Sequence, residues 1–380
     1  MIIRTIQEEI IKRATGSKIV KPIFVVGPRQ VGKTTLIKEI KPELDLPVMW
    51  WNGDDADIGE LLQIPTPARL RQLIGQTSTL IIDEAQRIEN ISQCLKVISD
   101  NLKQVKVIAI GSSSFDSVTK TNEPSGRKGE FLLFPFSFGE MVNQHGLLEE
   151  NRQLTHRLLF GYYPDVINNP GDEQTKLKQL TDTILYRDVV RSERILKPEK
   201  LEKLVQELAW QVGKDVSYYE LGQTCGLDNQ TVEKYILALE KAFIIHRLPC
   251  LNRALSNELK KSRKIYFYDN GIRNAVVNQF NPIEQRNDAD LLWENFLINE
   301  RRKYITYQNL HSERYFWRTH AQQEIDYIEE RNGAVSAFIF KWNPKAKARF
   351  SQSFVKAYHP IETKVISRDN FFEFVGLEWT

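Results

Sequence analysis

The chain has 380 residues, of which 41% are hydrophobic and 27% are charged, and its formal net charge is +3. The length predicts two or three domains, and the composition excludes a wholly disordered chain. The small net charge gives no general argument for nucleic-acid binding, so any basic surface has to be local.

The cysteines and the N-terminus bear on the compartment. Cys94, Cys225 and Cys250 stand far apart without CxxC spacing, which predicts reduced core residues in a cytoplasmic protein. The N-terminal stretch MIIRTIQEEIIKRATG is amphipathic and interrupted by charges, unlike the apolar segment of a signal peptide. No apolar run approaches the length of a membrane span, so we expect no membrane partner.

The first motif is GPRQVGKTT, which follows the apolar run IFVV and precedes LIKEI. Its spacing matches G-x-x-x-x-G-K-[ST], the loop between a strand and a helix that cradles phosphates. Glycines at both ends let backbone N–H groups point at phosphate oxygens, and the helix N-terminus adds a favourable dipole. We therefore predict that ATP is bound by Gly27, Pro28, Arg29, Gln30, Val31, Gly32, Lys33, Thr34 and Thr35. Lys33 is expected to reach the β- and γ-phosphates, and the Thr34 hydroxyl to ligate Mg²⁺.

A second apolar run ends in two carboxylates, in TLIIDEAQRI. A parallel strand that is buried on both faces is apolar throughout, and ligands bind at its C-terminal end. Asp83 is expected to hold Mg²⁺ through water and to contact the nucleotide. Glu84 is expected to orient or deprotonate the water that attacks the γ-phosphate. Beside the phosphate loop, this functional interpretation is favoured over capping of a strand end.

Two further candidates follow along the chain. VKVIAIGSSS predicts a third strand that ends in serines, where Ser112 or Ser113 is positioned to sense the γ-phosphate; a serine-rich turn is the alternative. Arg127, in SGRKGEF, is a candidate catalytic arginine finger or nucleotide contact. A solvated loop arginine is the competing interpretation.

Together these segments carry a resemblance. GPRQVGKTTL, LIIDEAQRI, IAIGSSSF and GR followed by FPFSFGE resemble a widespread prokaryotic family of AAA-type ATPases. In that family the ATPase is followed by a C-terminal domain of unknown function, and GYYPDVI, ILYRDVV and KIYFYDNGIRNAVV are similar to its later signature segments. The resemblance implies an α/β P-loop NTPase with a parallel sheet at residues 1–150. It implies a helical and winged-helix domain at 151–255 and a degenerate restriction-endonuclease-like α/β domain at 256–380.

The middle of the chain predicts a helix-turn-helix. In VSYYELGQTCGLDNQTVEKYILALEKAFIIHRLP, residues 219–225 and 230–242 are expected to form two helices around a glycine turn, and FIIHRLP a wing. Gln230, Thr231 and Lys234 would then face a DNA major groove, within a candidate DNA-binding segment at 216–248. The second helix carries two glutamates and two lysines, a poor balance for gripping phosphates. A packing or protein-docking role is the alternative.

The last third resembles a nuclease that lacks part of its chemistry. Glu294, Asp326 and Lys341 match the helix glutamate, strand aspartate and lysine of the restriction-endonuclease-like core. The glutamate of the Glu-x-Lys pair is replaced by Ile339, and neither Glu324 nor Glu329 stands in its register. A Mg²⁺ site loses charge and geometry with that ligand. We therefore expect Glu294 and Asp326 to be ordinary surface or strand-end carboxylates, and KKSRK (260–264) to be a solvated turn.

The main functional expectation is a Mg²⁺-dependent AAA-type ATPase that couples nucleotide state to C-terminal binding domains associated with DNA. A nucleotide-dependent switch for a protein partner is the alternative, and an ATP-gated nuclease is a weaker one. Proteins of this type often form rings in which a neighbour supplies an arginine, so an oligomer is an open alternative.

Overall fold

The structure is a computed structural model that describes residues 2–16, 21–112, 129–191, 193–253 and 262–377. The chain separates into two compact units, Met1–Phe136 and Ser137–Thr380. Residues 137–150, which we assigned to the first domain, therefore belong to the second compact unit. The division of the chain into three functional domains stays a prediction.

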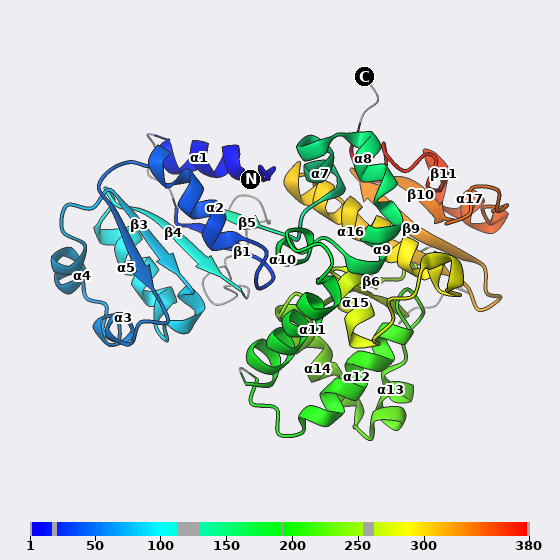
Figure 1. The fold of residues 1–380 in the computed structure, drawn as a ribbon, viewed down its shortest axis with the longest axis horizontal. Helices are drawn as coiled ribbons and strands as arrows, with labels where there is room; N and C mark the ends of the chain where they lie inside the picture. Colours follow the sequence, from blue (N-terminus) through cyan, green and yellow to red (C-terminus); the bar gives the residue numbers. More distant parts are fainter. Residues whose placement is uncertain (1, 17–20, 113–128, 192, 254–261, 378–380) are drawn as a thin grey trace. The chain divides into compact units, whose positions relative to one another are not determined.

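The N-terminal unit is built on a five-stranded parallel sheet with the order β2-β3-β4-β1-β5 (Figure 1). The interior strand β1, which lies between β4 and β5, is buried at all four positions, as its sequence IFVV predicts. The five strands are β1 (Ile23–Val26), β2 (Val48–Asn52), β3 (Thr79–Asp83), β4 (Lys106–Gly111) and β5 (Glu130–Leu132). The helical elements of this unit are α1 (Gln7–Thr15), α2 (Lys33–Ile40), η1 (Lys41–Glu43), α3 (Ala56–Leu61), α4 (Pro67–Ile74), η2 (Ala85–Arg87) and α5 (Ile91–Asn101).

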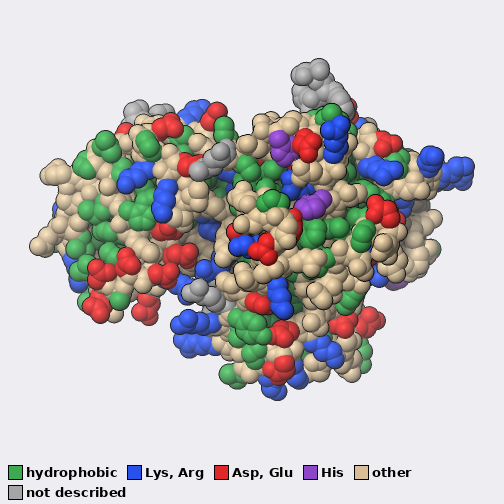
Figure 2. Space-filling model, in the orientation of Figure 1, with side chains coloured by type: hydrophobic (Ala, Val, Ile, Leu, Met, Phe, Trp, Pro, Cys, Tyr) green, Lys and Arg blue, Asp and Glu red, His purple; other side chains and the backbone are tan. Residues whose placement is uncertain are grey.

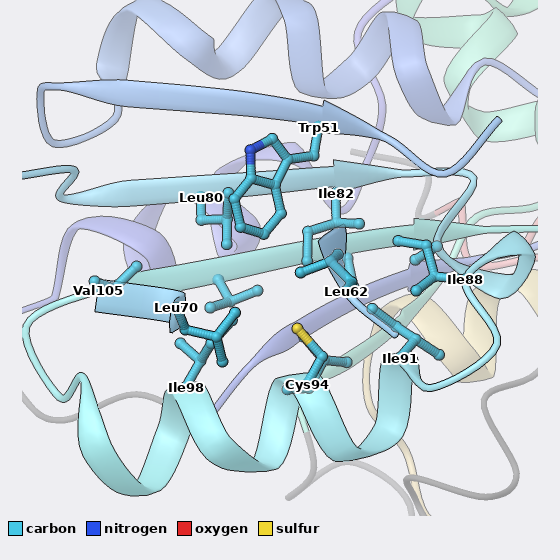
Figure 3. Close-up of a cluster of buried hydrophobic side chains, with 14 of the residues drawn as sticks. Trp51, Leu62, Leu70, Leu80, Ile82, Ile88, Ile91, Cys94, Ile98 and Val105 are labelled. Atoms are coloured by element: carbon cyan, nitrogen blue, oxygen red, sulfur yellow. The ribbon is translucent and has the colours of Figure 1, made fainter. Parts of the chain in front are cut away.

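A core forms where one face of this sheet meets α5 (Figure 3). Trp51 and Leu80 point from the strands toward Cys94 and Ile98 of the helix. Cys94 is fully buried, and burial raises the pKa of its thiol to about 12, so it behaves as a small apolar side chain. Packing on this face fixes the sheet and holds the C-terminal ends of β3 and β4 in place.

The C-terminal unit begins with helices that lead into a helix pair and a β-hairpin. A π-helical segment, η3 (Ile184–Val190), continues α11. The helices up to the hairpin are α7 (Phe138–His145), α8 (Leu147–Arg152), α9 (Leu154–Phe160), α10 (Pro164–Ile167), α11 (Glu173–Thr183), α12 (Pro198–Trp210), α13 (Tyr218–Cys225) and α14 (Asn229–Lys241). The hairpin consists of β6 (Ile245–Pro249) and β7 (Arg263–Phe267), which pair antiparallel.

The predicted helix pair is present with the expected turn chemistry. Gly226 has φ +64° at the end of α13, a conformation that favours glycine. The Asp228 side chain accepts a hydrogen bond from the Thr231 backbone N–H at 2.9 Å and caps α14. The helices therefore begin and end within one residue of the predicted bounds.

The rest of this unit is a four-stranded mixed sheet, ordered β11-β10-β9-β8, with a long helix beside it (Figure 1). Its elements are α15 (Asn270–Val276), η4 (Ile283–Gln285), α16 (Ala289–Tyr307), β8 (Glu313–Arg318), β9 (Glu324–Arg331), β10 (Ala334–Phe340), α17 (Gln352–Tyr358) and β11 (Glu362–Ile366). Only β10 and β11 pair in parallel, and α17 lies between them in sequence. Within the described ranges, no helix has both the length and the apolar character that a membrane crossing requires.

Charges of both signs are mixed on the surface. On the face that Figure 2 shows, Lys and Arg side chains are interspersed with Asp and Glu side chains. This arrangement agrees with the small net charge of the sequence. A site for anions has to be sought in the local pairing of individual cations.

Candidate nucleotide-binding site

The glycine loop connects β1 to α2 and depends on two unusual backbone conformations. Gly27 has φ +152°, and a Cβ atom there would lie 2.0 Å from the Leu133 carbonyl oxygen. Gly32 has φ +92° at the N-terminus of α2. Glycine is required at the first position by the close approach of β5's continuation and at the second by the left-handed backbone. The loop can therefore direct its N–H groups inward, as its sequence predicts.

Lys33 is held at the loop by the loop's own carbonyls. Its Nζ donates hydrogen bonds to Gly27 O at 2.9 Å and to Pro28 O at 2.6 Å, and only 7% of the residue is exposed. The ammonium is thereby fixed beside the ring of backbone N–H groups. An ammonium in this position can neutralise charge on a bound phosphate.

Thr34 and Asp83 meet at the mouth of the loop. The Thr34 hydroxyl donates to Asp83 Oδ2 at 2.9 Å, which joins the first turn of α2 to the end of β3. Both are hard oxygen ligands of the kind that Mg²⁺ prefers. Among the described residues there is no cluster of three or more His, Cys, Asp or Glu side chains able to hold a metal. A site with two protein oxygens fits Mg²⁺, which keeps water and phosphate oxygens as its other ligands.

Glu84 continues from Asp83 in a strained conformation. Its φ is +46°, a left-handed backbone that costs a non-glycine residue on the order of 1–3 kcal/mol. Its carboxylate accepts a hydrogen bond from Gln86 Nε2 at 2.6 Å, and the same amide donates to Ser112 Oγ at 3.0 Å. Gln86 therefore links the ends of β3 and β4. Sequence analysis did not select Gln86, although its position two residues after Glu84 could have indicated a side-chain contact between the two.

Arg4 is a second residue that sequence analysis missed, and it holds the phosphate loop through hydrogen bonds. Arg4 is 5% exposed, and it donates to Val31 O at 2.9 Å and to Phe134 O at 2.6 Å. Its guanidinium carbon also lies 4.7 Å from the centre of the Phe136 ring. Because Val31 belongs to the phosphate loop, this arginine fixes the loop to the segment that follows β5. Arg4 lies 27 residues before Val31, so no local sequence motif indicates that the two are in contact.

The other predicted loop residues differ in exposure, and some candidates cannot be placed. Pro28 and Val31 are buried, whereas Gln30 and Thr35 are exposed; Arg29 and Thr34 are intermediate. Ser112 is 8% exposed at the end of β4. Ser113 and Arg127 lie outside the described residues, so their predicted roles stay predictions.

In the second unit, the expectation that Glu294 is an ordinary surface carboxylate was wrong, whereas Asp326 is partly exposed near the start of β9. Glu294 is 8% exposed, and it accepts hydrogen bonds from Lys264 Nζ at 3.0 Å and from Tyr266 Oη at 2.6 Å. Lys264 also pairs with Glu324 at 2.6 Å and is 1% exposed, so it is not part of a solvated turn. Asp326 accepts from the Phe340 N–H at 2.7 Å. Glu294 and Lys264 are thus buried together, whereas Glu324 and Asp326 are partly exposed.

The protonation of this carboxylate cluster (Glu294, Glu324 and Asp326 around Lys264) follows from burial. Burial raises the pKa of Glu294 to about 7, and Asp326 adds to this while Lys264 opposes it. Burial alone would lower the pKa of Lys264, but the three carboxylates outweigh it and raise that pKa. The ammonium therefore stays charged, whereas Glu294 takes up a proton near neutral pH.

The exposed face of α14 carries polar, charged and apolar side chains. Gln230, Glu233 and Lys234 are exposed on α14, and Leu237 is 42% exposed. The Thr231 hydroxyl donates to Asp228 Oδ2 at 2.7 Å, so it serves the helix cap. Of the three residues predicted to face a DNA groove, the structure leaves two exposed.

The sheet order, the glycine loop, Lys33 and the Thr34–Asp83 pair together define a P-loop NTPase fold. Comparison with family models agrees, because residues 20–142 match an AAA domain. Residues 151–283 and 290–372 match two domains described only as of unknown function, DUF8612 and DUF4143. The chain therefore combines a segment that matches an AAA domain with later segments that match domains of unknown function, which is the arrangement that the sequence resemblance implied.

Individual relatives extend the match along the chain without adding a function. An uncharacterized protein of Mycobacterium tuberculosis is 24% identical over 323 residues, which cover 84% of this chain and 70% of that protein. An uncharacterized protein of Haemophilus influenzae is 24% identical over 242 residues, covering 60% of this chain and 58% of that one. Among solved structures, a RuvB variant of Thermotoga maritima has a TM-score of 0.31 at 16% identity, covering 64% of this chain and 87% of that one. A structure of Pif1 helicases on forked DNA has a TM-score of 0.23 at 15% identity, covering 42% of this chain and 52% of that one.

Proposed function

We propose that the protein binds ATP with Mg²⁺ and hydrolyses it, and that nucleotide state controls what the C-terminal unit binds. The observation that carries this proposal is the 2.9 Å contact between Thr34 Oγ1 and Asp83 Oδ2 at the mouth of the glycine loop. It brings two Mg²⁺ ligand types together beside the phosphate cradle. Such a pairing has no comparable role in a plain glycine turn.

The proposed chemistry assigns one task to each side chain. Lys33 neutralises charge that develops on the β- and γ-phosphates, and Thr34 and Asp83 hold the metal. The metal, when bound, supplies positive charge to the phosphate oxygens. Glu84 orients the water for in-line attack on the γ-phosphate. The Arg127 role as an arginine finger or nucleotide contact is retained as part of the proposal.

Gln86 links Glu84 to Ser112, the residue that we predicted to sense the γ-phosphate. Because its amide donates to both the Glu84 carboxylate and Ser112 Oγ, a γ-phosphate that recruits Ser112 would alter the hold on Glu84. We infer that this chain of hydrogen bonds orients the general base according to the nucleotide present.

Binding and turnover are tested by two pairs of variants. Lys33→Ala is expected to abolish ATP binding measured by calorimetry with Mg²⁺, while Lys38→Ala, an exposed lysine on the same helix, leaves it unchanged. Glu84→Gln is expected to bind ATP but to lower phosphate release at least about 100-fold, and the exposed Glu89→Gln serves as its control. Undiminished turnover in Glu84→Gln refutes the role of Glu84, and absence of ATP uptake by the wild type refutes the whole proposal.

The identity of the partner is the finer question. DNA contact through residues 216–248 is supported by the exposed Gln230 and Lys234. The ATPase rate with and without DNA, together with gel shifts with and without ATP at two salt concentrations, tests it. Binding to DNA that weakens with salt and changes with ATP supports a DNA partner.

A protein partner is the second candidate, and the face of α14 favours it. Glu233 would repel a phosphate backbone, and the exposed Leu237 offers apolar area to a protein. No shift of DNA in any nucleotide state, combined with unchanged binding of ATP, would favour this candidate. Some AAA-type proteins act as rings, and light scattering with and without ATP tests whether this chain assembles.

An ATP-gated nuclease receives little support. Lys264 Nζ bonds Glu294, one of the carboxylates that a Mg²⁺ ion would need, and the position of a further ligand is taken by Ile339, which is 6% exposed. We expect a plasmid to stay intact with the protein, ATP and Mg²⁺ or Mn²⁺. Cleavage that depends on Asp326 would refute this expectation.

The cysteines support a cytoplasmic location. Cys94, Cys225 and Cys250 are free and buried, and free buried thiols are typical of a reducing compartment. Cell fractionation tests this location.

A further inference from the structure

Arg302 and Arg314, together with Arg247, line a pocket of about 310 Å³ in the C-terminal unit. Arg302 comes from α16 and Arg314 from β8, and His246 and Arg247 of β6 line a third side. All three elements belong to the same compact unit. None of the residues that line the pocket belongs to the nucleotide site or to the carboxylate cluster.

The acidic residues that could neutralise these two arginines are bonded to others. Glu313, which also lines the pocket, accepts hydrogen bonds from Arg253 at 3.2 Å and from Tyr315 Oη at 2.6 Å. Two further carboxylates of this neighbourhood are each bonded to another arginine. Those two pairs are Arg247–Glu240 at 2.7 Å and Arg301–Glu329 at 2.8 Å.

Arg302 and Arg314 keep only neutral partners or none. Arg302 Nη2 donates to Tyr268 Oη at 3.0 Å, and its guanidinium carbon lies 5.1 Å from that ring's centre. Within the described part of the chain, Arg314 has no hydrogen bond and no ion pair. Burial lowers the pKa of Arg314, and the charge of Arg302 lowers it further, whereas Tyr327, Glu329 and Tyr268 oppose this shift. The two guanidiniums thus stand close together, and neither is hydrogen-bonded to a carboxylate within the described residues; Glu329, which acts on Arg314 from the paired strand, is bonded to Arg301.

His246 does not add to this charge. Burial lowers the pKa of His246 well below its usual value, and Arg302 and Arg314 lower it further. Its Nε2 lies 3.1 Å from Asn299 Oδ1. The Asn299 amide nitrogen donates to the Phe267 and Asn295 carbonyls, so Oδ1 accepts and His246 donates through Nε2. The pocket therefore carries the charges of Arg302 and Arg314 beside a neutral imidazole.

We propose that this pocket binds a phosphate monoester or free phosphate between Arg302 and Arg314. A guanidinium presents a planar fork of N–H donors that matches phosphate oxygens. A phosphate monoester carries between about −1.5 and −2 charges at neutral pH, which balances two arginines. A volume of about 310 Å³ is at the small end for ligand sites. The pocket therefore suits a phosphoryl group at the end of a ligand, not a whole nucleotide.

The test uses the full chain and inorganic phosphate, AMP and adenosine at constant ionic strength. Calorimetry is expected to show saturable uptake of phosphate and of AMP, and none of adenosine. Arg314→Gln and Arg302→Gln should each weaken phosphate binding at least tenfold. Arg349→Gln, which removes an exposed arginine outside the pocket, should leave it unchanged. AMP that binds at least as well as free phosphate identifies a monoester, and stronger binding of free phosphate identifies the ion as the ligand.

Two further arms separate this pocket from the nucleotide site and from misfolding. Lys33→Ala should keep phosphate binding at the pocket, whatever it does to ATP. Removing one of two neighbouring like charges should leave the melting temperature of Arg314→Gln without phosphate unchanged or higher. The rise in melting temperature that phosphate causes in the wild type should disappear in that variant. Arg314→Lys, which keeps the charge but not the fork, should bind phosphate more weakly than the wild type.

The proposal is overturned if the wild type shows no saturable phosphate binding up to tens of millimolar. It is also overturned if both glutamine variants bind phosphate as well as the wild type. Binding of an oligonucleotide without a terminal phosphate, in the absence of any binding of phosphate or AMP, would overturn it in favour of a nucleic-acid backbone.

Discussion

Replacing Lys264 by methionine should destabilise the C-terminal unit more than any substitution on its surface. The side chain is 1% exposed and pairs with Glu294 at 3.0 Å and with Glu324 at 2.6 Å. Methionine has a similar length, so the substitution removes the charge while it leaves little cavity. The Glu294 carboxylate, which is 8% exposed, would lose its cationic partner.

The magnitude follows from the geometry. Removing one partner of a buried ion pair costs about 3–5 kcal/mol, because the remaining charge is buried without compensation. At pH 8 we expect a loss of this size. Glu294 already has a pKa raised to about 7 by burial, so its contribution to stability is full below pH ~4.5 and is lost as the pH rises through 7. Loss of the ammonium should raise the pKa values of Glu294 and Asp326 further, because Lys264 lowers both.

The pH dependence distinguishes lost charge from lost packing. Between pH 8 and pH 5.5 the wild type gains stability as Glu294 takes up a proton, and Lys264→Met gains more because more carboxylates become protonated. The difference between the two proteins should therefore shrink on acidification. A packing defect would give the same difference at both values of pH.

Hydrogen exchange of the α16 and β7 amides at both pH values measures this stability locally, without requiring that a chain with several domains unfold in one step. Lys345→Met, an exposed lysine of the same unit, should change the free energy by less than about 0.5 kcal/mol. Equal protection of wild type and Lys264→Met at pH 8 would mean that the carboxylates need no ammonium, and the reasoning would be refuted.

Two further predictions concern the phosphate loop. Gly27→Ala should abolish ATP binding and lower stability by about 3 kcal/mol or more, because its Cβ would lie 2.0 Å from a carbonyl oxygen. Gly59→Ala, where a Cβ meets nothing within 4 Å, should raise the melting temperature slightly. Arg4→Met should weaken ATP binding about tenfold in calorimetry, because hydrogen bonds from a charged group to Val31 O and its neighbour are worth about 1.5–3 kcal/mol. Arg4→Lys should recover part of that affinity. Equal affinity of the wild type and both variants would show that the loop keeps its conformation without Arg4.

The parts that sequence predicted well are those whose chemistry is local. The spacing of Gly27, Gly32 and Lys33 specifies a strand, a loop and a helix, because backbone geometry and phosphate binding require these residues in that order. The run before Asp83 predicts a buried parallel strand for the same reason. The Asp228 cap and the Gly226 turn located the helix pair within a residue.

The parts that sequence could not reach depend on residues brought together from distant segments. Arg4 supports Val31 across 27 positions, and Lys264 enters the carboxylate cluster from a strand 30 positions before Glu294. A lysine in KKSRK looks solvated because local charge says nothing about which side of a strand faces a core. Only the pairing of β6 with β7 turns Lys264 inward.

By itself, the sequence determined that this chain has a phosphate-binding loop and the side chains that accompany a magnesium nucleotide, because that chemistry is written in neighbouring residues. The tertiary structure alone decided which charges are neutralised. In the folded chain, Lys264 pairs with the carboxylates of the cluster. Other arginines pair with Glu240, Glu313 and Glu329, and Arg302 and Arg314 line a pocket. Charge compensation acts over a few ångströms in space, and separation along a chain does not specify that distance.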